Sequence, residues 1–394
     1  MTPHPPPLPS SPHPAAPWVP PSETEQRLHE AALRGDVEAQ IRALAEAQLF
    51  VGAPRAEVDA DPDTVWWRPQ QVGNGLVVRP LLTRGMLPPW HPDWVFHGVT
   101  LRWAAEFPWR DPRVLLAVNG GMPGEVLLPA TPEHRAWWLR CYAEKEQGAD
   151  NRFIALRHGP LHGPLAFGLA CGAHLAFVNG VPWNEVGTAY LGYTDELGTL
   201  RDAWGVTDPA GWRGELDALL DGRNSPAEPD FVLRVREELC ARRGALPSPD
   251  EWRETAAGHA QDLGAHPTAV RHIEELVRRV LRYEARFRAD ALLPPDGRVR
   301  RTVAYDYGRA VNVARWGLSA RFCAPPEADQ AIVHAGALAR AAYGSWEEYS
   351  AGYALGRVLR FDGEEYGRYH EQNVAAHRTL TEHAGSPWRN LPWR

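Results

Sequence analysis

Cysteine is scarce in this sequence, with four residues among 394. Cys141, Cys171, Cys240 and Cys323 lie far apart, and none of them belongs to a CxxC pair. This spacing is typical of neither a disulfide framework nor a zinc site. Because an unpaired cysteine usually behaves as a small buried apolar residue, we expect buried free thiols in a protein of a reducing cytoplasm.

Long apolar runs and an excess of positive charge are also missing. No segment approaches the ~18 consecutive apolar residues that a membrane-spanning helix needs, and the first residues lack the charged and apolar regions of a signal peptide. The formal net charge is -7 at pH 7, which argues against a broad nucleic-acid-binding face, because such a face needs clustered lysine and arginine. We therefore expect neither a membrane nor a nucleic-acid partner.

The common catalytic signatures are absent from the sequence. Gly73-Asn74-Gly75 lacks the third glycine of a dinucleotide fingerprint, and neither a Walker lysine motif nor a GxSxG motif occurs. His158, His162 and His174 are near one another in the sequence, but no carboxylate or cysteine accompanies them at a metal-ligand spacing. The sequence thus predicts no metal and no cofactor, and it favours a protein that is not an enzyme.

Tryptophan and proline, in contrast, are abundant. The chain has 17 tryptophans, so we expect aromatic side chains to dominate its packing. Ten of the first 21 residues are prolines, a composition that predicts a disordered tail over residues 1–21. At 394 residues the chain exceeds the size of a single hydrophobic core, which favours two domains after this tail.

Residues 22–130 show helical and then strand patterns. Ser22 and Glu25 have the spacing of a capping box, and apolar residues recur at mostly helical intervals as far as Leu49. Short apolar runs then predict strands at 75–78, 95–96, 114–118 and 126–128, with a turn at residues 119–121. We interpret residues 22–130 as a small α+β module.

Residues 131–394 predict a mainly α-helical domain. Thr131 and Pro132 match the N-cap and first position of a helix, and Gly163 opens a small apolar segment typical of a buried helix. Two helices are expected around the turn at Asp208-Pro209. Further helices are predicted at 231–243, 266–289, 299–322, 326–343, 345–359 and 364–383. The predicted fold class is therefore an α+β module followed by a mainly helical C-terminal domain.

Two of these helices carry arginine beside aromatic residues on one face. Arginine stacks on aromatic rings and presents a planar set of donors to carboxylates or phosphates. Nearby aspartates add the possibility of acid, base or metal-ligand chemistry. The candidate cluster comprises Asp306, Arg309, Asn312, Arg315, Trp316, Trp346, Tyr353, Arg357 and Asp362.

Two interpretations of this cluster are open. In the first, Arg309, Arg315 and Arg357 hold a phosphate or carboxylate in a pocket. In the second, Asp306 and Asp362 neutralise the arginines inside an aromatic core, because a buried charge needs a partner. We favour the second interpretation, and the solvent exposure of the arginines distinguishes the two.

The motifs AYDYGRAVNVARWG (304–317), SWEEYSAGYALGRVLRFDG (345–363) and SPWRNLPW (386–393) follow one another in an order that resembles a bacterial family known as domain of unknown function 1266. The resemblance extends back to about Gly163. It implies a shared domain but no reaction, because the family has no established activity. The preceding region, including LLAVNGGMPGEVLLPA (115–130), is similar to the SseB-type small α+β domain, which implies interaction or scaffolding.

We expect this chain to be a cytoplasmic protein-binding or adaptor protein, since aromatic side chains are favoured interface anchors. The alternative is an enzyme or sensor that binds a phosphorylated or carboxylated small anion through the candidate cluster. The last residues carry a further prediction. Because Pro387 and Pro392 cannot continue a helix, we expect Trp388 and Trp393 to fold back as a closing strap on the helices that carry Arg309 and Arg357.

Overall fold

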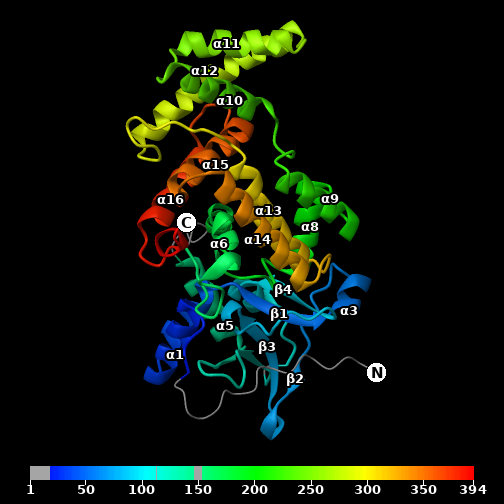
Figure 1. Cartoon of the computed structure of the whole chain (residues 1–394). Helices are drawn as coiled ribbons and strands as arrows, with labels where there is room; N and C mark the ends of the chain where they lie inside the picture. The colour runs from blue at the N-terminus through cyan, green and yellow to red at the C-terminus, as the bar shows by residue number, and fades with distance from the viewer. Residues whose placement is uncertain (1–17, 112, 146–152) are drawn as a thin grey trace.

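The computed structural model of this chain describes residues 18–111, 113–145 and 153–394. Most of the predicted proline-rich tail at residues 1–21 lies outside this part. An α+β region comes first and a mainly helical region follows it, so the predicted fold class is confirmed (Figure 1). The sheet lies at one end of the molecule, and residues 228–289 lie at the other.

The strands of the N-terminal region are β1 (Leu49–Pro54), β2 (Gln70–Gln71), β3 (Val77–Thr83), β4 (Trp94–Val99), β5 (Leu115–Val118) and β6 (Val126–Pro129). They form a sheet of order β4-β1-β3-β5-β6, and β2 pairs with β3 outside this path. β3 and β5 are parallel, whereas the other pairs are antiparallel. Asn119 and Gly121 have φ values of 54° and 74° in the predicted turn between β5 and β6.

Leu49 corrects the sequence analysis, because it begins a strand rather than continuing a helix. The preceding helix ends at Glu46, and Leu49, Phe50 and Val51 are all buried in β1 between β3 and β4. A strand buried on both faces reads as a continuous apolar run. Such a run cannot be told from a buried helix by periodicity alone.

The helices of this region are α1 (Glu23–Arg34), α2 (Val37–Glu46), α3 (Arg55–Ala60), α4 (Leu101–Glu106) and α5 (Pro132–Ala143). Thr131 caps α5, as predicted, by accepting a hydrogen bond from the N–H of His134. Trp138 and Cys141 of α5 are buried in the same core as the sheet, together with residues of α1, α2 and α4. Packing on the sheet thus continues past residue 130. The division of the chain at that residue stays a prediction.

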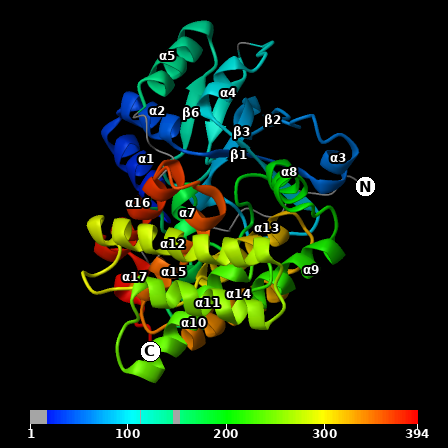
Figure 2. The ribbon, with the colours of Figure 1, turned by 90° about the horizontal axis from the view of Figure 1, so that it is seen from above.

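The helical region contains α6 (Gly163–Cys171), α7 (Ala173–Val178), α8 (Tyr193–Trp204), α9 (Pro209–Leu220), α10 (Glu228–Arg243), α11 (Pro249–Asp262), α12 (Pro267–Ala289), α13 (Ala304–Ser319), α14 (Pro325–Ala342), α15 (Trp346–Phe361), α16 (Arg368–Glu382) and α17 (Pro387–Asn390). The predicted helices are all present, with shifted ends. The predicted segment at Gly163 is two helices that meet at Gly172. The sequence patterns missed α11, which lies beside α12 at the end of the molecule opposite the sheet (Figure 1), and Figure 2 shows both helices from above.

α13 is the central helix of this region. Every residue from Ala304 to Ser319 is buried, and the helix packs against α6, α7, α8, α9, α14 and α15. Two glycines permit this close packing. A Cβ at Gly317 would lie 2.0 Å from the Trp212 indole nitrogen, and one at Gly308 would lie 2.8 Å from the Tyr353 ring.

Residues 386–393, the C-terminal strap, fold back onto the helical region. The Trp388 ring stacks on Trp346 of α15, with centroids 5.4 Å apart, and its Nε1 donates to the carbonyl of Ala170 at 3.0 Å. Trp393 Nε1 donates to the carbonyl of Tyr343 at 2.9 Å. The predicted packing on the helix that carries Arg357 is confirmed.

Two arginines and a tryptophan join the helical region to the sheet. Arg321 donates to the main-chain carbonyls of His91 at 3.1 Å and Trp94 at 2.5 Å. Trp90 Nε1 donates to the carbonyl of Leu318 at 3.0 Å, and Arg84 donates to that of Ala189 at 2.8 Å. We call these contacts the joint. The hydrogen bonds of Arg321 and Trp90 hold the end of α13 against β4 and the loop before it.

Candidate functional site

All nine residues of the candidate cluster are buried, and none is more than 8% exposed. Five of them lie on α13, three lie on α15, and Asp362 follows α15 directly. Two of the predicted motifs therefore meet in the core of the helical region. Their side chains, however, contact different groups of the same chain.

Arg309 and Asp306 form a buried ion pair on one turn of α13. Asp306 also accepts hydrogen bonds from the Ser225 hydroxyl at 2.5 Å and from the Ser225 N–H at 3.2 Å. The Arg309 guanidinium lies over the Tyr305 ring, 4.1 Å from its centroid, and near Trp204. This half of the second interpretation is confirmed, since the aspartate supplies the counter-charge.

Asn312 and Arg315 contact Tyr190 and main-chain groups instead of an acid. The Tyr190 hydroxyl donates to Asn312 at 2.8 Å, and Asn312 donates to the carbonyls of Gly308 and Gly172. Arg315 donates to the carbonyl of Pro182 at 2.6 Å and lies 4.6 Å from the Tyr190 ring centroid. Burial lowers the pKa of Arg315 from its ordinary value.

Asp362 does not neutralise Arg357, which corrects the other half of that interpretation. Asp362 accepts from the Tyr283 hydroxyl at 2.7 Å and from the N–H groups of Tyr366 and Gly367 at 3.1 Å each. Arg357 donates to the amide oxygens of Gln372 at 2.7 Å and Asn373 at 3.3 Å. Asp362 therefore accepts hydrogen bonds from the main-chain N–H groups of the loop before α16, and it acts as a local cap of that loop.

The three aromatic members of the cluster lie in separate ring contacts. Trp346 packs against the C-terminal strap, and its Nε1 donates to the carbonyl of Leu391 at 2.8 Å. Trp316 meets the Tyr190 ring edge-on at 5.5 Å. Tyr353 stacks on His174, with centroids 4.4 Å apart, and its hydroxyl has no hydrogen-bond partner among the described residues.

His174 belongs to a buried polar chain that the sequence analysis missed. His174 Nε2 lies 2.9 Å from the Ser350 hydroxyl, which lies 2.8 Å from His377 Nδ1. Burial lowers the pKa of His174 well below its ordinary value and that of His377 to about 4. Both rings are therefore neutral at pH 7, so each ring has one nitrogen that donates and one that accepts.

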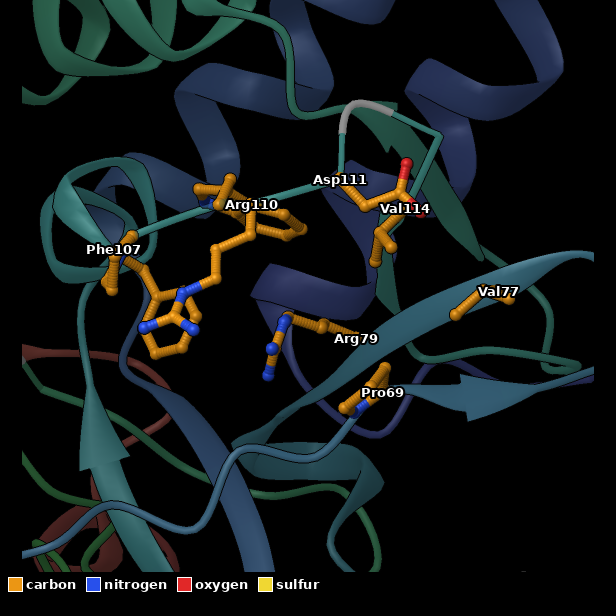
Figure 3. Close-up of a pocket in the computed structure, with 9 residues that line it drawn as sticks. Pro69, Val77, Arg79, Phe107, Arg110, Asp111 and Val114 are labelled. Carbon is orange, nitrogen blue, oxygen red and sulfur yellow. The ribbon is translucent and has the colours of Figure 1, made fainter.

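A pocket of about 490 Å³ lies in the N-terminal region, away from the candidate cluster. It opens between β3, the start of β5 and the loop that joins α4 to β5 (Figure 3). Its size is that of a small-molecule site. The residues that line it are Pro69, Val77, Arg79, Phe107, Pro108, Trp109, Arg110, Asp111 and Val114.

Arg79 and Arg110 give this pocket its positive charge. The Arg79 guanidinium lies 4.6 Å from the Phe107 ring centroid and 5.5 Å from that of Trp67. Neither arginine has a hydrogen-bonded acceptor or an ion-pair partner among the described residues. Figure 3 shows both guanidinium groups on the side of the pocket where Phe107 lies. Partial burial lowers the pKa of Arg79 from its ordinary value, but an arginine remains charged at pH 7.

Asp111 does not neutralise either of these arginines. Its carboxylate accepts from Arg113 at 2.9 Å and 3.1 Å, and this guanidinium lowers the pKa of Asp111 to about 2. Asp111 and Val114 lie across the pocket from the two unpaired guanidinium groups in Figure 3. The pocket therefore carries two positive charges that no described acid compensates.

Sequence reasoning missed this pocket because its residues come from separate loops and strands. The visible signal was aromatic residues next to arginine, in Trp66-Trp67-Arg68 and in Phe107-Pro108-Trp109-Arg110. Neither segment matches a known motif. Only the pairing of β3 with β5 brings Arg79 beside the second segment.

α13, α15 and the C-terminal strap lie within a segment that matches a family model. Residues 199–393 match the family described as protein of unknown function, DUF1266. This match confirms the resemblance of the C-terminal region, although it begins at residue 199 and not near Gly163. No curated protein and no solved structure matches the chain. The candidate cluster lies within the DUF1266 match, whereas the pocket precedes it.

In the part of the chain that the structure describes, no group of three or more His, Cys, Asp or Glu side chains is arranged to hold a metal ion. No described helix is both long and apolar enough to cross a membrane. The four cysteines are free thiols, three of them buried as predicted, whereas Cys240 is half-buried.

Proposed function

We propose that this chain is a cytoplasmic ligand-binding protein whose pocket, at Arg79 and Arg110, takes a small molecule with an anionic group. The observation that supports the proposal is the pair of unpaired guanidinium groups in an aromatic-walled pocket. Such groups bind carboxylate or phosphate through charge-assisted hydrogen bonds. The ligand class is the one expected for the candidate cluster, but the site is in a different part of the chain.

The pocket favours binding over catalysis. Asp111 is the one carboxylate among its described lining residues, and its low pKa makes it a weak base at pH 7. Phe107, Trp109 and Val114 offer apolar contact without reactive groups.

Calorimetric titration with benzoate, phthalate and phenyl phosphate tests the proposed function. At least one of these aromatic anions should bind the wild type and bind Arg79→Gln about 10-fold to 100-fold more weakly, which is the scale of a charge-assisted hydrogen bond. The matched control is Arg102→Gln, since Arg102 is an exposed arginine on α4 that pairs with Glu106 outside the pocket. Equal affinities for the wild type and Arg79→Gln would overturn the proposal.

Protein binding is the second candidate function, and one exposed aromatic pair favours it. Phe361 and Tyr369 stack with centroids 5.4 Å apart, although they are 47% and 37% exposed. The Arg360 guanidinium lies 5.5 Å from the Phe361 ring centroid. Aromatic residues and arginine are enriched at protein interfaces. This patch supports the expected adaptor role, which the resemblance to SseB-type domains also implies.

Affinity purification of the tagged full chain from its native cells, at several salt concentrations, tests the adaptor role. A bound protein should be recovered with the wild type and lost with the double variant Phe361→Ser and Tyr369→Ser. Circular dichroism checks that the variant is folded. Recovery of the chain alone at every salt concentration would contradict this role.

A further inference from the structure

The charge of the pocket points to a ligand with two negative charges. Arg79 and Arg110 each contribute one positive charge, and Arg113 already pairs with Asp111 at 2.9 Å. A monocarboxylate brings one negative charge and two oxygens, which a single guanidinium can satisfy. A phosphate monoester brings a charge of about -1.5 to -2 at pH 7 and three terminal oxygens.

The orientation of Arg79 also favours an ester of phosphate. Its Cζ lies over the Phe107 and Trp67 rings, and the rings accept no hydrogen bond from it that would occupy its N–H groups. Arg110 has no described partner and lies on the same side of the pocket (Figure 3). A phosphate monoester offers three terminal oxygens to these two guanidinium groups, whereas a carboxylate offers two.

The rest of the pocket fits a flat apolar group on the ester. Val77, Val114 and Pro69 line one part of it, and the Trp109 indole is fixed by a hydrogen bond of 2.9 Å from its Nε1 to the carbonyl of Ala104. A volume of about 490 Å³ leaves room for a ring beside the phosphate. Ring stacking and apolar contact would hold this part of the ligand.

We propose that the pocket binds a phosphate monoester whose organic part is flat and apolar. This inference rests on the proposed function, because it names the ligand class of the same site. The phosphate lies between Arg79 and Arg110, and the flat group lies toward Trp109 and Val114. Arg110 then acts as the residue that distinguishes a dianion from a monoanion.

Calorimetry with four probes tests this ligand class in the full chain. Phenyl phosphate is the matched probe, benzoate has the ring with one charge, phthalate has the ring with two carboxylates, and glycerol 1-phosphate has the phosphate without a ring. Phenyl phosphate should bind at least 10-fold more tightly than each of the others. An equal affinity for phthalate or for glycerol 1-phosphate would overturn the proposal.

Arg110→Gln supplies the decisive comparison. The variant should weaken phenyl phosphate binding about 10-fold and change benzoate binding less than about twofold, while Arg102→Gln changes neither. Lowering the pH from 7.5 to 5 should weaken phenyl phosphate binding to the wild type, because the phosphate loses its second charge near pH 6. The same pH step should have little effect on Arg110→Gln. Binding of benzoate alone would reject the phosphate ester but keep the proposed function, whereas no binding by any probe would reject both.

Discussion

Glu196 lies fully buried at the start of α8, where that helix meets β4. Its Oε1 accepts hydrogen bonds from the N–H groups of Leu191 and Gly192, and its Oε2 has no partner among the described residues. Burial raises the pKa of this carboxyl group to about 8, from an ordinary value of 4.5. Glu196 is therefore protonated at pH 7 in the folded protein, unlike the exposed acids.

Glu196→Gln should make the folded protein less sensitive to alkaline pH. Because the folded pKa lies above the unfolded one, the stabilisation by Glu196 is complete below pH 4.5 and is lost as the pH rises toward 8. At pH 5 we expect the free energy of unfolding of the variant to lie within about 1 kcal/mol of that of the wild type. At pH 8 we expect it to exceed the wild-type value by about 2 kcal/mol. Urea denaturation at both pH values measures the difference. Parallel pH profiles for the two proteins would contradict the shifted pKa.

His174 and His377 act on stability in the opposite direction. Their pKa values are lowered by burial, so the unfolded chain takes up protons before the folded protein does. Their stabilisation is present above pH 6.5 and is lost as the pH falls toward 4. A comparison at pH 5 and 8 therefore needs Glu196→Gln and the wild type side by side, since the histidines contribute equally to both.

The candidate cluster shows which contacts of single residues can be predicted from the sequence. Asp306 and Arg309 are three positions apart on one helix, so their ion pair was predictable from helical periodicity. Asp362 was assigned the wrong partner, because Tyr283 comes from α12, 79 residues earlier in the chain. No local pattern indicates which distant donor reaches a buried carboxylate.

At the scale of elements, proline and capping residues were the reliable signals. Ser345 begins α15 by accepting from the N–H of Glu348, and Asp208 begins α9 in the same way from Ala210 and Gly211. β1 was missed because a buried strand and a buried helix present the same apolar run. α11 was missed although Ser248 caps it, since its own sequence is mostly polar.

Removal of the C-terminal strap should destabilise the helical region. Deletion of residues 386–394 exposes the Trp346 surface that Trp388 and Trp393 cover. We expect a loss of about 3 to 5 kcal/mol from the free energy of unfolding, which is the scale of removing one large buried aromatic side chain. Thermal and urea denaturation measure the loss.

A point variant and a control sharpen this test. Trp388→Ala should reproduce most of the loss, whereas Arg394→Ala, at an exposed terminal residue, should cost less than about 0.5 kcal/mol. An unchanged melting temperature after the deletion would instead indicate that the strap is a partner-binding peptide.

At the scale of the whole molecule, Arg84 and Arg321 join the two regions together with Trp90. Of the 42 basic residues, Lys145 is the one lysine. The Arg321 side chain is 8% exposed and donates to main-chain carbonyls on both sides of the joint. A planar guanidinium with five N–H groups suits this role, because several carbonyls can share one cation. Burial lowers the pKa of Arg321 to about 10, which still leaves it charged at pH 7.

Arg321→Met should uncouple the sheet from the helical region. The variant keeps the apolar stem but leaves the carbonyls of His91 and Trp94 without their donor, at a cost of about 3 kcal/mol. Differential scanning calorimetry should show one transition for the wild type and a broadened or split transition at lower temperature for the variant. Arg213→Met, at an exposed arginine paired with Glu327, is the control. A single transition at the wild-type temperature would show that the joint does not couple the regions.

The sequence by itself determined the fold class, most helices of the C-terminal region and the folded-back strap, because helix periodicity, capping residues and proline act over a few neighbouring positions. Only the tertiary structure decided which residues form a pocket. It buried Arg309, Arg315 and Arg357 among acceptors of the same chain, and it left Arg79 and Arg110 without a hydrogen-bonded acceptor or an ion-pair partner among the described residues. The reason is that burial and charge pairing depend on contacts between distant segments, here β3 and the loop before β5, which no local pattern records.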